Sequence, residues 1–164
     1  MADKYEIKTD ILAPSDKKII EYTGFHPTKI IKAMPELLKD VLKAGGGDVF
    51  EVVLKWDVSG DPTSFYAEWL AKSDFDLRSR AEFKIVAQGK QSAKDKMGNI
   101  KIALKGYVKT EFPNITFLHK SVVPIYMYTF YNKQRREYID AGKIMLDRIE
   151  GEIRGMFNLI KRGG

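Results

Sequence analysis

The apolar residues near the C-terminus constrain the fold of this chain most strongly. Between residues 139 and 160 they keep a spacing of three or four, with Gly142 between the first two, at Ile139, Leu146, Ile149, Ile153, Met156 and Ile160. Residues with this spacing share one face of an α-helix. The pattern predicts an amphipathic helix over residues 138–161, or a longer helix bent near Gly142. Its apolar face has to be buried against another element.

The surface that this helix covers is predicted from five runs in which apolar and polar residues alternate. A period of two is typical of half-buried strands, and the runs cover residues 5–11, 50–58, 64–72, 77–85 and 100–109. The last four follow one another at the spacing of hairpins, and the polar connection over residues 89–98 suits a hairpin tip. A further strand over residues 115–118 is left open. The runs therefore predict an antiparallel sheet.

A second amphipathic stretch lies between the first two strand-like runs. After Pro27, the apolar residues Ile30, Ile31, Met34, Leu37, Leu38, Val41 and Leu42 lie on one helix face. Pro35 falls inside this stretch, and proline removes a hydrogen bond and clashes with the preceding turn. We therefore expect two short helices, or one kinked helix, between the first and second strands. The fold class is α+β, in one domain over residues 1–164.

Composition excludes several classes of site. The 164 residues contain no cysteine and only two histidines, His26 and His119, which stand in no ligand-spaced pattern, so we expect no metal or other cofactor. Because the N-terminus is charged and no apolar stretch is long enough to span a bilayer, a cytoplasmic protein is expected. Glycine-rich phosphate loops and nucleophile elbows are absent from the sequence. A non-enzymatic role is therefore favoured, and no catalytic residue is named.

Large aromatic residues mark the candidate binding site. Trp56, Phe65, Trp69 and Phe83 occupy the apolar positions of three successive strand-like runs, so their rings should converge on the inner face of the sheet. The C-terminal segment should meet them near Tyr128, Met145 and Ile149. Gly142 lacks a side chain on that helix face and suggests room for an apolar ligand. The alternative is a filled core.

Basic residues suggest a different partner. The net charge is +6, and residues 125–138 interleave aromatic residues with arginine and lysine, a composition that suits stacking on bases and contact with phosphates. The same aromatic residues also suit a helix–sheet interface. Weak, non-specific nucleic-acid binding requires one continuous basic face, made of Arg135, Arg136, Lys101, Lys105 and Lys109.

The order of the predicted elements resembles a known superfamily. A strand, two short helices, a glycine-rich turn, a run of antiparallel strands and a long terminal helix are similar to the helix-grip fold of the START-like proteins, which include birch-pollen-allergen and polyketide cyclase-like domains. The segment Ile11-Leu12-Ala13-Pro14-Ser15 resembles the entry from strand to helix in microbial members. The resemblance implies a curved sheet gripped by the last helix around an apolar cavity that holds lipids or other hydrophobic molecules.

The leading functional hypothesis is therefore a protein that binds a hydrophobic small molecule, lipid-like or aromatic. The alternatives are a non-specific nucleic-acid-binding protein and an enzyme of the cyclase or hydrolase type. Fold analogy supplies a class of ligand without a mechanism. The sequence patterns determine neither the identity of the ligand nor the oligomeric state.

Overall fold

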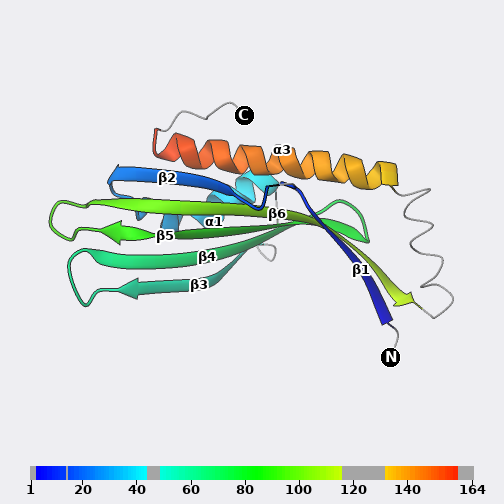
Figure 1. The fold of residues 1–164 in the computed structure, drawn as a ribbon, viewed down its shortest axis with the longest axis horizontal. Helices are drawn as coiled ribbons and strands as arrows, with labels where there is room; N and C mark the ends of the chain where they lie inside the picture. Colours follow the sequence, from blue (N-terminus) through cyan, green and yellow to red (C-terminus); the bar gives the residue numbers. More distant parts are fainter. Residues whose placement is uncertain (1–2, 14, 44–48, 116–131, 159–164) are drawn as a thin grey trace.

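Six antiparallel strands form one curved sheet in the computed structural model, which describes residues 3–13, 15–43, 49–115 and 132–158 (Figure 1). The strands are β1 (Asp3–Asp10), β2 (Lys18–Phe25), β3 (Val49–Asp57), β4 (Thr63–Asp74), β5 (Ser79–Gln91) and β6 (Met97–Ile115). Strands β3 to β6 are neighbours in sequence and in space. This arrangement confirms the antiparallel sheet that the alternating runs predicted.

Strands β1 and β2 both pair with the long strand β6. Strand β2 pairs with the first half of β6, from Phe25 opposite Met97 to Lys18 opposite Leu104, and β1 pairs with the second half. The sequence did not predict β2, because a lysine interrupts the apolar alternation on its inner face. Lys18 has a specific reason to lie there, since its ammonium group contacts Asp147 and Glu150 of the C-terminal helix.

A single helix, α1 (Lys29–Leu42), follows β2, and Pro35 lies inside it. The described residues therefore correct the expectation of two short helices between the first and second strands. An interior proline costs about 3 kcal/mol. However, α1 buries the seven apolar side chains named above, each of which contributes about 1.5–3 kcal/mol. The burial outweighs the break that Pro35 would otherwise cause.

The C-terminal helix α3 (Asn132–Met156) confirms the predicted amphipathic helix, although it begins earlier and ends earlier than residues 138–161. Its buried side chains include Leu146, Ile149 and Ile153. Helix α3 contacts β5 and β6, α1 contacts β3 and β4, and the two helices contact each other. Both helices thus cover the inner face of the sheet, and α3 runs along it (Figure 1). Neither of these described helices is long and apolar enough to cross a membrane.

The inner face consists of cross-strand rows of apolar residues. Phe65 lies opposite Trp56 on β3 and opposite Gly89 on β5, and Trp69 lies opposite Ile85. Residues that face each other in antiparallel strands share one side of the sheet. Across these rows the side chains alternate between large and small, and the buried alanines of β4 and β5 lie between the rings.

A bulge between Glu51 and Val53 shifts the faces of β3. Phe50 lies opposite Leu70 on the outer face, whereas Trp56 lies opposite Phe65 on the inner face. The alternation had predicted that Phe50 and Trp56 share a face. A β-bulge inserts one extra residue and reverses the parity of the side chains beyond it.

Candidate functional site

Most of the predicted ligand-binding residues belong to the packed core. Trp69, Phe83 and Ile149 are fully buried, and Phe65 is only 4% exposed. Met145 is half-buried and packs against the same core. The structure thus places these five residues on the elements that the sequence predicted, and the presence of a ligand among them stays a prediction.

Two predicted site residues lie elsewhere. Trp56 is 48% exposed, because β3 ends the sheet on its side among the described strands. Tyr128 lies outside the described residues. Trp56 is therefore the predicted residue best placed to meet a ligand from solvent.

The space beside Gly142 is filled by Ile11. A Cβ atom added to Gly142 would lie 2.6 Å from Cδ1 of Ile11, and one added to Gly106 would lie 3.1 Å from the same methyl group. Ile11 is 1% exposed and follows directly after β1. The missing side chain of Gly142 thus admits a core residue of the chain itself. It does not provide the room that the sequence suggested.

An open pocket of about 600 Å³ lies at the end of the β3–β4 hairpin. Its apolar part is formed by Leu54, Trp56 and Phe65, and the ring centroids of Trp56 and Phe65 are 5.9 Å apart. The two rings face each other because their residues are directly paired across β3 and β4. The volume falls within the usual range for small-molecule sites.

Polar groups surround this pocket. The Ser59 hydroxyl and amide donate hydrogen bonds of 2.6 Å and 3.0 Å to Asp57 Oδ1, and these bonds lower the pKa of Asp57. The Tyr66 hydroxyl donates a hydrogen bond to the Glu68 carboxylate, and this bond, together with burial, raises the pKa of Tyr66. At neutral pH Asp57 is therefore a carboxylate and the Tyr66 phenol is neutral.

Trp69 carries an unused polar group. Its Nε1 atom is buried and has no hydrogen-bond acceptor within the described part of the chain. A buried donor usually has a partner, either from the protein or from water. The indole N–H of Trp69 is therefore a polar donor within an otherwise apolar row of the inner face.

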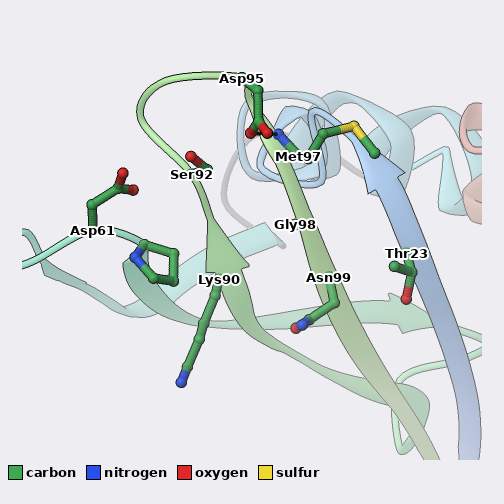
Figure 2. Close-up of a pocket in the computed structure, with 9 residues that line it drawn as sticks. Thr23, Asp61, Lys90, Ser92, Asp95, Met97, Gly98 and Asn99 are labelled. Carbon is green, nitrogen blue, oxygen red and sulfur yellow. Dashed lines mark hydrogen bonds between the residues drawn. The ribbon is translucent and has the colours of Figure 1, made fainter.

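A second pocket, of about 400 Å³, lies where the tips of two hairpins approach β2 (Figure 2). Asp61 Oδ1 accepts a hydrogen bond from the Ala93 amide, and Asp95 Oδ1 accepts one from the Met97 amide. Lys90 points away from both carboxylates (Figure 2). The two aspartates thus stabilise the loops that carry them. The only sequence signal for this pocket is the polar tip of the hairpin over residues 89–98.

The basic residues proposed for nucleic-acid binding lie on two faces. Lys101, Lys105 and Lys109 alternate with buried residues of β6 and so point to the outer face. Arg135 lies 3.5 Å from Thr9 Oγ1, and Thr9 is paired with the buried residue Val108, on the inner side. The five residues therefore do not form one continuous surface. Nucleic-acid binding itself remains a prediction.

Carboxylates surround one of these cations, Lys109. Lys109 Nζ lies 3.3 Å from Glu6, 3.5 Å from Glu111 and 3.9 Å from Glu82. Burial works to lower the pKa of Lys109, but the hydrogen bond to Glu6 and the charge of Glu82 outweigh it and raise that pKa. The Lys109 cluster, made of Lys109 and these three glutamates, is an internal ion-pair network of the outer face.

Comparison with known families and proteins gives no assignment. No family model matches the chain, and no curated protein is significantly similar to it. The functional interpretation therefore rests on the geometry of the described residues.

Metal chemistry has no support in that geometry. Within the described ranges no group of three or more histidine, aspartate or glutamate side chains is arranged to hold a metal ion. His26 is exposed at the end of β2, and His119 lies outside these ranges.

Proposed function

We propose that this protein binds a hydrophobic small molecule, aromatic or lipid-like, in the pocket of Leu54, Trp56 and Phe65. The observation that supports the proposal is the half-exposed Trp56 ring beside the Phe65 ring in an open pocket of about 600 Å³. An exposed indole in a concave site is a common anchor for apolar ligands.

The energy available at Trp56 is large enough to matter. A ligand that covers the exposed half of the indole removes roughly 100 Å² of apolar surface from water, which contributes about 2.5 kcal/mol. Lys55, Asp57 and Tyr66 at the rim of the pocket favour a ligand that also carries a polar end. An amphipathic molecule with a flat or flexible apolar body fits this combination.

The resemblance to the helix-grip superfamily also supports this proposal. A curved antiparallel sheet with a C-terminal helix is compatible with that fold. Members commonly hold their ligand between the sheet and the last helix. Here Ile11 fills the space beside Gly142, so we place the ligand at the open end of the β3–β4 hairpin.

The test uses the fluorescent probe anilinonaphthalene sulfonate, which combines an apolar ring system with an anion. We expect saturable binding to the folded protein and a loss of affinity of about tenfold or more in Trp56→Ala, as expected when an anchor of this energy is removed. Leu77→Ala is the matched control, because Leu77 is also an exposed apolar residue but does not line the pocket.

A second measurement reports the site directly. The chain has two tryptophans, so Trp69→Phe leaves Trp56 as the only indole. Its emission should shift to shorter wavelength as the probe or a fatty acid is added. Equal probe affinity in the native protein and Trp56→Ala would refute the proposed site.

A further inference from the structure

The free edge of β3 is the most apolar exposed feature of the described sheet. Strand β3 pairs with β4 on one side, and no described strand pairs with it on the other. Exposed apolar side chains follow one another along this edge, from Phe50, Val52 and Leu54 to Trp56 and Val58. An edge of this kind presents unpaired backbone groups together with apolar surface.

Edge strands are usually protected against pairing by charges and bulges. The bulge of β3 is confined to the positions around Val52, so the stretch from Val53 onward keeps a regular register with β4. Lys55 is the one basic residue of β3, and an acidic residue, Asp57, lies two positions away on the same face. The edge therefore carries a pair of opposite charges in its regular part.

These charges are complementary to those of an identical strand. When two copies of β3 are aligned antiparallel with Trp56 opposite Trp56, Lys55 of each copy lies opposite Asp57 of the other. Leu54 of each copy then lies opposite Val58 of the other, the residue that directly follows β3. Opposed residues of antiparallel strands share a face, so the alignment joins the two Trp56 side chains on the inner side and opposite charges on the outer side.

We propose that β3 pairs with β3 of a second copy of this chain, centred on Trp56, to form a two-fold symmetric dimer with a continuous sheet. The two-fold axis makes every contact occur twice, which is the usual geometry of homodimers. The Lys55 ammonium group has no carboxylate partner among the described residues. Asp57 accepts hydrogen bonds from Ser59 alone in that part of the chain. Both charges are thus available to the second copy.

The bulge excludes the competing alignment. Centring the strands on Val53 would place Glu51 opposite Lys55 and Phe50 opposite Trp56, which also looks complementary in sequence. However, Phe50 lies on the outer face and Trp56 on the inner face, so these two rings would not meet. The alignment on Trp56 uses only residues beyond the bulge.

The dimer goes beyond ligand binding and does not depend on it. It would bring the two pockets, each containing Trp56, next to each other across the axis. Because the paired segments are short, we expect a weak dimer whose population rises with protein concentration.

The test is charge exchange, followed by sedimentation velocity without any ligand. The native protein should shift from monomer to dimer along a concentration series. Lys55→Glu should weaken the dimer by more than about tenfold, because it places an acidic residue opposite Asp57 on both sides of the axis. Asp57→Lys should have the same effect, because it places a basic residue opposite Lys55. An equimolar mixture of the two variants should dimerise again, because each acidic position then faces a basic one.

Controls separate this result from a folding defect. Lys84→Glu reverses an exposed charge on β5 and should leave the native association unchanged. Circular dichroism should show the same fold in all variants. A native protein that stays monomeric at every concentration would overturn the dimer and leave the edge to a different extended partner. Single variants that associate as strongly as the native protein would overturn the alignment.

Discussion

Cδ1 of Ile11 lies 2.6 Å from the position that a Cβ atom would take on Gly142. The contact joins the turn after β1 to the middle of α3 and fixes how closely the helix approaches the sheet. A real Cβ atom at this distance would force the Ile11 side chain or one of the two elements to move, because protein interiors are close-packed.

The first prediction concerns this contact. Gly142→Ala should destabilise the protein by about 1–3 kcal/mol, the usual cost of overpacking, although alanine in a helix interior is otherwise favoured over glycine by about 1 kcal/mol. Gly151→Ala and Gly155→Ala are matched controls in the same helix, since an added Cβ meets nothing within 4 Å at either position. Both controls should be neutral or stabilising in chemical denaturation.

A double-mutant cycle identifies the partner. Ile11→Val removes the Cδ1 methyl group, so the cost of Gly142→Ala should fall in that background. Additive effects of the two substitutions would show that Ile11 is not the residue that opposes the alanine.

The second prediction concerns the apolar face of α3. Ile149→Ala and Ile153→Ala should each lower the free energy of unfolding by about 2–5 kcal/mol, because both side chains are fully buried and leave a cavity when truncated. Ile144→Ala is the control from the same helix, since Ile144 is 62% exposed. It should change stability by less than about 0.5 kcal/mol. Equal effects at the three positions would contradict the orientation of α3.

The third prediction concerns Pro35 in α1. Pro35→Ala restores the amide that can donate to the Ile31 carbonyl, so helix α1 should gain about 1–2 kcal/mol after the greater freedom of the unfolded chain is allowed for. Thermal unfolding measures this gain. A loss of stability instead would mean that the proline ring itself packs in a required contact.

The fourth prediction concerns pH and the Lys109 cluster. The folded pKa of Lys109 is raised above 10.5, the value of a free lysine. The contribution of this group to stability is therefore fully present below pH 10.5 and is lost as the pH rises through the folded pKa. Native protein should lose stability in that alkaline window, and Lys109→Met should lose less there.

The same variant is also tested at neutral pH. There Lys109→Met removes one cation from the carboxylates, while Arg80 still pairs with Glu82 and Glu111, and the loss should cost about 1–3 kcal/mol. Denaturation curves at neutral and alkaline pH check both expectations. A cost that is the same at both pH values would point to lost packing of the lysine stem.

The sequence predicted those elements whose side-chain period is uninterrupted. Strands β4, β5 and β6 and helix α3 show a regular alternation or stripe, and each overlaps its expected range, with ends that differ by one to six residues. Strand β2 was missed because Lys18 stands at an inner-face position, where its charge is matched by Asp147 of a helix far along the chain. A local pattern contains no information about such a distant partner.

For the candidate site, the sequence predicted which types of residue form it but not where they lie. Trp56 and Phe65 were expected on the inner face of the sheet, and their ring centroids lie 5.9 Å apart. Their position at the open edge of the sheet depends on strand order, which periodicity does not determine. Likewise, the face of Phe50 depends on a bulge that leaves the sequence pattern unchanged, and the use of the space at Gly142 depends on Ile11.

Because β1 and β2 share β6 as their partner, the two N-terminal strands cannot pair until residues 97–115 have been synthesised. The β3, β4 and β5 hairpins can form earlier, since each strand meets its neighbour within a short stretch of chain. During translation the first 25 residues therefore remain without their sheet partner while the middle of the chain folds. Contacts of such long sequence separation slow folding. The synthesis of β6, rather than of the N-terminal strands, therefore determines when this sheet can be completed.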